Sequence, residues 1–143
     1  MSSPQTNQIV IFSLGEEEYA LPITRVQEII RYSQPRTVAS SQPWIRGVIN
    51  LRGKIVPVCD LAQRLGVSVA PVEQAKTVIV ETAIGTAGVV VDDVEEVLTI
   101  DATQLEEVPA TDADYVDAVA TVGDRLIILL NPDGLFRGVE LAA

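Results

Sequence analysis

The chain has 143 residues, a length that suits one domain or two small lobes that share a core. Hydrophobic residues make up 48% of it but aromatic residues only 4%, so the core must be built from Val, Ile, Leu and Ala, which favours β-strands. Twenty Asp and Glu against ten Lys and Arg give a formal charge of -10, which repels phosphate backbones and anionic lipid head groups and argues against nucleic acid as a partner.

The residues that most often build metal sites are scarce. There is no histidine, the commonest ligand of zinc and the commonest general base near neutral pH. The single cysteine, Cys59, rules out an intramolecular disulfide and is predicted to be a small buried thiol. The first residues do not resemble a signal peptide, and no apolar run approaches the roughly twenty residues that cross a bilayer. We expect a cytoplasmic protein with no metal, no cofactor and no direct membrane insertion.

The first element in chain order is a predicted β-hairpin, with strands at 9–14 and 19–23 around a glycine and three glutamates. Residues 24–30 then predict a short helical turn, capped by a threonine, in which Val26 and two isoleucines share one face. An extended conformation fits this segment nearly as well. Residues 32–42 are rich in Ser, Pro and Gln and are predicted to form a loop.

The segment 45–60 is the hairpin around which we expect the chain to be organised. Two β-branched runs flank the turn formers Asn50 and Gly53. Arg52 lies at the bend, where its cation is suited to reach a carboxylate or a partner, although charged residues are common at turns for no further reason. A short helix is predicted over 61–65, with an aspartate as its N-cap and a glycine at its end.

The second half of the chain repeats the first. Residues 77–98 align without a gap on residues 9–30, so that Val94 and Glu96 fall on a valine and a glutamate 68 residues earlier. A hairpin over 115–130 then repeats the central one. The order of elements supports an internal repeat, against chance similarity of apolar strands. Short strands with regular turns predict two small barrels that pack on each other.

No catalytic constellation is apparent. The acidic clusters are typical of solvated faces and loop edges, and Asp112 with Asp114 lacks the further ligands and the turn glycine of a calcium loop. No glycine-rich phosphate loop and no nucleophile elbow occurs. The sequence therefore predicts a binding module. Two alternatives stay open: a small acidic β-barrel enzyme with carboxylates in a closed cleft, and a barrel that binds a small ligand in an apolar cavity.

A binding surface is predicted where two hairpin units meet. Glu28 and Arg52 carry opposite charges on neighbouring units, so a groove in which they pair is reasonable. An exposed pair of this kind stabilises a fold by only about 0 to 1 kcal/mol, so orientation of a contact surface explains it better than stability. Val26 fits core packing and an interface equally well. The short segment 61–65 adds an amphipathic edge.

Several motifs resemble the CheW-like coupling proteins of bacterial chemosensory systems. The most characteristic is Asn-Leu-Arg-Gly at 50–53, followed by Ile-Val-Pro-Val-Cys-Asp at 55–60. The likeness covers residues 8–138. The segments that carry it are 11–23, 26–29, 45–53, 55–61 and 88–94.

The resemblance implies a mainly β fold of two SH3-like five-stranded barrels, packed side by side around a shared core, with short helices. It implies one domain over 8–138, with lobe 1 at about 8–66 plus possible C-terminal packing and lobe 2 at about 76–131. It also implies a non-enzymatic adaptor between the cytoplasmic tip of methyl-accepting chemotaxis receptors and the regulatory domain of a CheA-type histidine kinase. Since no ATP-binding domain, phosphotransfer histidine or receiver is present, we expect a stand-alone coupler, recruited to receptor arrays at the inner face of the membrane.

The site residues come from the same resemblance, position by position. The kinase-facing surface has no sharp motif, and Val89–Asp92 is our expectation for part of it. The residues that match places associated with receptor and kinase coupling are Val26, Glu28, Gly47, Asn50, Arg52 and Gly53.

Overall fold

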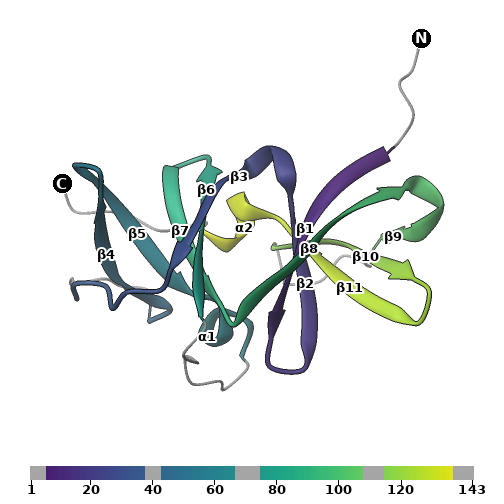
Figure 1. The fold of residues 1–143 in the computed structure, drawn as a ribbon, viewed down its shortest axis with the longest axis horizontal. Helices are drawn as coiled ribbons and strands as arrows, with labels where there is room; N and C mark the ends of the chain where they lie inside the picture. The colour runs from purple at the N-terminus through teal and green to yellow at the C-terminus, as the bar shows by residue number, and fades with distance from the viewer. Residues whose placement is uncertain (1–5, 38–42, 67–74, 108–114, 137–143) are drawn as a thin grey trace, which may run out of the picture.

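The structure is a computed structural model, and it describes residues 6–37, 43–66, 75–107 and 115–136. Two β-sheets lie side by side in it, with a few short helices (Figure 1). This confirms the predicted mainly β fold with two lobes. The loops expected at 68–74 and 109–114, and with them Asp112 and Asp114, lie outside the described residues.

One sheet, which we call the six-stranded lobe, has the strand order β8-β1-β2-β11-β10-β9. Its strands are β1 (Thr6–Leu14), β2 (Glu17–Pro22), β8 (Asp93–Asp101), β9 (Leu105–Glu107), β10 (Val116–Val122) and β11 (Arg125–Leu130). The family resemblance implied five strands in each lobe. The sixth is the three-residue β9, which pairs with β10.

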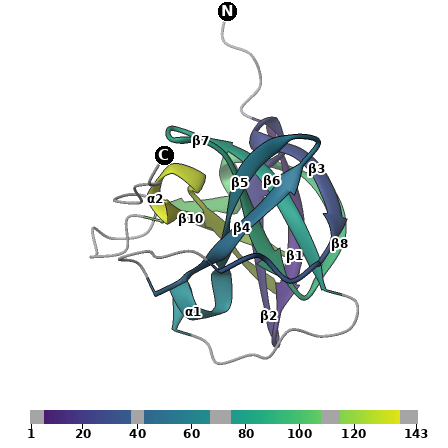
Figure 2. The same ribbon diagram turned by 90° about the vertical axis from the view of Figure 1, so that its left-hand side faces the viewer.

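The other sheet, the five-stranded lobe, has the order β3-β6-β7-β5-β4. Its strands are β3 (Val26–Arg31), β4 (Ile45–Leu51), β5 (Lys54–Asp60), β6 (Lys76–Thr82) and β7 (Gly85–Val91). Figure 2 looks at the molecule from the end of this lobe, where β4 and β5 lie in front. The helices are α1 (Leu61–Leu65) and α2 (Pro132–Leu135), with 3-10 turns η1 (Ile23–Arg25) and η2 (Ala102–Gln104).

The two sheets do not follow the expected lobes of 8–66 and 76–131. The five-stranded lobe is the continuous stretch from β3 to β7, whereas the six-stranded lobe combines the N-terminal hairpin β1–β2 with β8 to β11. The chain therefore crosses between the sheets at η1 and again at Asp92. The reason is that each half of the sequence gives its first hairpin to the lobe of the other half.

Strand pairing confirms the internal repeat. The orders β8-β1-β2-β11-β10 and β3-β6-β7-β5-β4 correspond strand for strand under the repeat seen in the sequence. The exchanged hairpins join by equivalent parallel pairs, Ala20 with Leu129 in one lobe and Gly88 with Val58 in the other. Because parallel pairing needs a long connection and has no local signature, the sequence pattern did not indicate the exchange.

The helical interpretation of residues 24–30 is wrong beyond the first turn. The 3-10 turn η1 ends at Arg25, and residues 26–31 form strand β3, which pairs with β6. A single helical turn is marginal in water, and β-branched residues favour a strand when a sheet edge is available to pair with. The prediction for α1 is confirmed, since the Asp60 carboxylate accepts a hydrogen bond from the Gln63 amide at 3.3 Å and the helix ends at Gly66.

A buried apolar core joins the lobes. Phe12 and Leu21 from the six-stranded lobe belong to the same cluster as Val78 and Val89 from the other, and α2, which lies between the lobes in Figure 1, adds further residues to it. This confirms the shared core that the fold class implies. Cys59 is fully buried in this cluster, and burial raises the pKa of its thiol well above the usual range, so it is inert as a nucleophile.

Arg64 on α1 contacts residues from both halves of the repeat. Its guanidinium carbon lies 4.8 Å from the ring centre of Trp44 and 4.6 Å from that of Tyr115, which precede the equivalent strands β4 and β10. Its nitrogens also donate to the carbonyls of Gly134 and Leu135 in α2, both at 3.4 Å. One cation thus lies between two aromatic rings and binds the C-terminal carbonyls of a helix, where positive charge is favoured.

We expect Arg64→Ala to lower the free energy of unfolding by about 2 kcal/mol, because it removes two cation–π contacts and two hydrogen bonds. Trp44 is the only tryptophan of the sequence and is 7% exposed, so its fluorescence should also shift to longer wavelength. Denaturant titration followed by this fluorescence measures both effects. Arg31→Ala, at an exposed position, is the matched control and should change stability by less than about 0.5 kcal/mol. Equal stability of the two variants would contradict the prediction.

Candidate functional site

The β4–β5 turn presents Arg52 in an ordered conformation. Leu51 pairs with Lys54, so Arg52 and Gly53 form a two-residue loop, and both have positive φ, at +52° and +85°. Such loops match the twist of a hairpin but usually carry Asn, Asp or Gly at the first position. Among the described residues Arg52 is the one non-glycine residue with positive φ. The Asn50 side chain stabilises the turn by accepting a hydrogen bond from the Gly53 amide at 2.7 Å.

Arg52 and Glu28 form the predicted ion pair. Arg52 Nη1 donates to Glu28 Oε1 at 3.3 Å, and Nη2 donates to Oε2, so the contact is bidentate. The hydrogen bond to Glu28 raises the pKa of the Arg52 guanidinium, which keeps its charge at any physiological pH. The Arg52 side chain is 69% exposed and that of Glu28 30%. The pair is therefore accessible to a partner, and it holds the long Arg52 side chain in one direction.

Two of the six predicted site residues lie away from this surface. Val26 is half-buried and packs against the shared core, so its side chain serves packing at least in part. Gly47 is buried in β4, directly beneath the backbone of Arg36, which forms an isolated bridge with Val48. The structure thus brings Glu28, Asn50, Arg52 and Gly53 together around one turn, while Val26 packs against the core and Gly47 lies against the backbone of Arg36.

A groove of about 340 Å³ adjoins the turn, where the sequence predicted one, although its lining residues were not predicted. It joins the exposed apolar Ile55, whose exposure is 58%, to the polar segment before β4. Asn50 belongs both to the groove and to the turn that carries Arg52. The lining residues are Ser33, Gln34, Arg36, Val48, Ile49, Asn50 and Ile55.

The six-stranded lobe carries a counterpart of the ion pair that sequence reasoning also missed. Arg125, which follows the β10–β11 turn, contacts Glu18 at 2.7 Å, Glu96 at 2.9 Å and Glu95 at 3.7 Å. Glu96 is the residue that the repeat aligns with Glu28. The repeat was a signal for this acidic cluster, because it aligns Glu96 with Glu28 and the β10–β11 hairpin with the β4–β5 hairpin.

The carboxyls of the acidic cluster have shifted pKa values. The hydrogen bond from Arg125 lowers the pKa of Glu18 to about 2. The hydrogen bond between Glu95 and Glu18 raises the pKa of Glu95 to about 7, with desolvation acting in the same direction. Between about pH 2 and pH 7 the two carboxyls therefore share one proton beside a single guanidinium.

We expect this cluster to stabilise the fold most near pH 4.5. Between pH 4.5 and 7 the folded protein holds a proton on Glu95 that the unfolded chain releases, so stability falls as pH rises through that range. Below pH 4.5 the unfolded chain takes up a proton that Glu18 in the folded protein does not, so stability falls again as pH drops toward 2. Thermal melts at a series of pH values measure the effect.

Glu95→Gln is the control for this prediction. Its amide can donate the same hydrogen bond to Glu18 without titrating, so the variant should gain stability relative to the natural chain as pH rises from 4.5 to 7. Parallel stability curves for the two proteins over that range would contradict the assignment of the proton to Glu95.

The surface expected at Val89–Asp92 is not available to a partner. Val89 and Val91 are fully buried, and Val90 is 7% exposed. The Asp92 carboxylate accepts a hydrogen bond from the Gly15 amide at 2.7 Å, where it holds the β1–β2 turn. Residues 89–91 are apolar on both faces because β7 lies between β6 and β5 in the sheet. The prediction that this run forms part of a kinase-facing surface is therefore wrong.

Among the described residues, neither alternative function finds a suitable site. The carboxyls that converge are those around Arg125, and they lie at the surface with exposures from 23% to 43% rather than in a closed cleft.

A larger cavity of about 670 Å³ lies beside β1, η1 and β10. Its lining mixes apolar and polar residues: Gln8, Ile9, Pro22, Ile23, Thr24, Thr99, Leu105, Asp117, Ala118 and Leu129. In the part of the chain that the structure describes, no group of three or more His, Cys, Asp or Glu side chains is arranged to hold a metal ion.

Two barrel-like lobes with a shared core and an exposed charged turn define a small β domain of a kind suited to protein docking. The model of the CheW-like domain matches residues 8–140 of the chain. The chain belongs to the CheW-like domain family. This confirms the prediction of a non-enzymatic adaptor of chemotaxis signalling.

Individual relatives agree with the family. The chemotaxis protein CheW of Klebsiella aerogenes is 34% identical over 141 residues, which cover 94% of this chain and 84% of that protein. CheW of Bacillus subtilis is 31% identical over 103 residues, covering 71% and 66%. The crystal structure of the scaffolding protein TtCheW from Thermoanaerobacter tengcongensis superposes with a TM-score of 0.86 at 36% identity and covers 94% of each chain.

Proposed function

We propose that this protein links the cytoplasmic tip of methyl-accepting chemotaxis receptors to the regulatory domain of a CheA-type histidine kinase, and that the Arg52 turn is its docking site. The role follows from family membership, and the residues follow from the surface around Arg52. The four site residues that gather at this turn are Glu28, Asn50, Arg52 and Gly53. The protein makes and breaks no covalent bond in this role. It acts in the cytoplasm, at receptor arrays.

The observation that carries the proposal is the pair Arg52–Glu28 on an ordered turn. An arginine held in a positive-φ conformation and 69% exposed contributes little to packing, so a contact outside the chain is the better reason for its geometry. The groove beside it offers Ile55 as an exposed apolar contact within reach of the same partner surface. A charged rim next to an apolar patch is the usual anatomy of a protein interface.

In the described structure, no helix is both long and apolar enough to cross a membrane. Under the proposal the protein reaches the membrane only through the receptor. Its net charge of -10 agrees with this, since anionic lipid head groups repel it.

Direct binding tests the proposal. The purified chain is titrated by calorimetry with the kinase regulatory domain from the same cell, and separately with a fragment of the receptor tip. We expect saturable binding to each fragment. An absence of binding to both, with the chain folded, would contradict the proposed function.

A further inference from the structure

The direction of Glu28 depends on a β-bulge in β3. Val26 pairs with Val80 and Glu28 pairs with the preceding residue, Ile79, so Gln27 is an extra residue in the strand. A bulge of this kind re-aims the side chains next to it, and a slip of one residue turns a side chain to the other face of a sheet. The presentation of Glu28 to Arg52 therefore requires that the bulge be held in place.

The same device occurs in the other lobe. Phe12 pairs with Val94 and Ile11 pairs with Glu96, which leaves Glu95 as the extra residue of β8. There too the glutamate after the bulge meets an arginine, because Glu96 contacts Arg125 at 2.9 Å. Its recurrence at the equivalent position links the bulge to the orientation of an acidic side chain.

Polar contacts connect the residues before and within the β3 bulge to strand β6. The Gln27 side chain donates a hydrogen bond to the Glu81 carboxylate on β6. Arg25, the last residue of η1, donates from Nε to the backbone carbonyl of Glu81 at 2.9 Å. The residues before and within the bulge are thus fixed to the same residue of the neighbouring strand.

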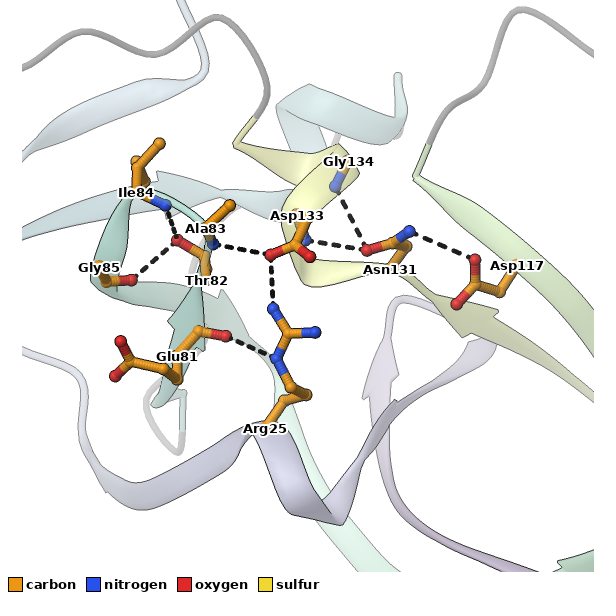
Figure 3. A network of polar contacts seen from close by, with 10 residues as sticks. All are labelled: Arg25, Glu81, Thr82, Ala83, Ile84, Gly85, Asp117, Asn131, Asp133 and Gly134. Carbon is orange, nitrogen blue, oxygen red and sulfur yellow. Dashed lines mark hydrogen bonds and ion pairs between the residues drawn. The ribbon is translucent and has the colours of Figure 1, made fainter.

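The other end of Arg25 reaches the six-stranded lobe's C-terminal helix (Figure 3). Arg25 Nη2 contacts Asp133 Oδ1 in α2 at 2.5 Å, and the same oxygen accepts a hydrogen bond from the Ala83 amide in the β6–β7 turn at 2.7 Å. Asp133 is itself fixed, since its amide donates to the Asn131 side chain at 2.9 Å. One guanidinium therefore connects the crossover between the lobes, strand β6 and helix α2.

We propose that Arg25 is a positioning residue for the Glu28–Arg52 pair and that Asp133 clamps it, so that helix α2 controls how the docking site is presented. The assignment of a docking role to this pair rests on the proposed function. The Arg25 and Asp133 side chains are 32% and 36% exposed, so their ion pair adds little stability. Its effect lies instead in the orientation of the strand that carries Glu28.

Two variants, Arg25→Gln and Asp133→Asn, test the proposal through the guanidinium NMR signals of Arg52 and through affinity for the kinase and receptor fragments. We expect both variants to move the Arg52 signals toward those of Glu28→Gln and to weaken binding by about two- to tenfold. Arg25→Lys, which keeps the charge, should restore part of the shift. Asp124→Asn, on the exposed β10–β11 turn, is the matched control and should leave both readouts unchanged.

Arg52 signals and affinities equal to those of the natural chain in both variants would overturn the proposal. Thermal melts of each variant separate repositioning from unfolding, and the signals of β4 and β5 report whether the lobe is intact. If the natural chain itself binds neither fragment, the proposed function fails, whereas the Arg52 signals still decide whether Arg25 positions the pair.

Discussion

Gly47→Ala is expected to lower the free energy of unfolding by about 3 kcal/mol, from backbone strain together with a steric clash. Gly47 has φ of +153°, and a Cβ added there would lie 2.0 Å from the carbonyl oxygen of Arg36. Relief of the clash requires Arg36 to move, which breaks its two backbone hydrogen bonds with Val48, at 2.8 and 2.9 Å. Urea titration measures the loss.

Gly123→Ala is the control, because Gly123 also has positive φ, at +61°, but has no atom within 4 Å of an added Cβ. It should cost only the conformational strain, about 1 kcal/mol. Equal losses in the two variants would show that the contact with Arg36 is unimportant. Under the proposed function, Gly47 acts on docking only indirectly, through Arg36, which lines the groove beside the Arg52 turn.

Arg52→Glu is expected to weaken binding to the kinase and receptor fragments by at least about tenfold, because charge reversal in a docking contact leaves the partner's groups unpaired. The fold should be unaffected, since the Arg52 side chain is 69% exposed and its ion pair is with Glu28 at the surface. Calorimetric titration against each fragment measures the loss, and a thermal melt confirms the fold.

Two further proteins sharpen this prediction. Arg31→Glu makes the same charge change at an exposed position of β3 and should bind as the natural chain does. The exchange Glu28→Arg with Arg52→Glu restores an ion pair within the chain but moves the cation away from the turn, so binding should stay weak. Unchanged affinity of Arg52→Glu would remove this residue from the docking site.

Local patterns in the sequence predicted the local structure well. The central hairpin, its turn at Asn50 and Gly53, and the capped helix α1 all depend on neighbouring residues, and each is confirmed. The internal repeat was also visible in the sequence, through the offset of 68 residues between Glu28 and Glu96. The structure confirms it, since both glutamates follow an equivalent bulge.

Long-range pairing was not predictable in the same way. The exchange of hairpins between the lobes rests on the parallel pairs of β5 with β7 and β2 with β11, and apolar β-branched strands fit either partner. The choice between helix and strand for β3 likewise depended on whether β6 offered an edge. Tertiary pairing decided both questions, and periodicity alone does not contain it.

In the candidate site, too, local features were predicted from the sequence and long-range contacts were not. The pairing of Glu28 with Arg52 followed from opposite charges on adjacent units, and the structure confirms it. The burial of Gly47 beneath Arg36 and the acidic cluster around Arg125 needed the fold. The residue type at the turn thus predicted the contact between the Glu28 and Arg52 side chains. It did not predict that the backbone of Arg36 packs against β4 and lines the groove.

Co-sedimentation of the kinase with receptor-containing membranes tests the central claim most directly. Kinase, membranes and this protein are mixed in all combinations, and the kinase in the pellet is measured. We predict that the kinase enters the pellet efficiently only when the natural chain is present, and that Arg52→Glu fails to replace it. Equal kinase in the pellet with and without the protein would contradict its role as the physical link between receptor and kinase.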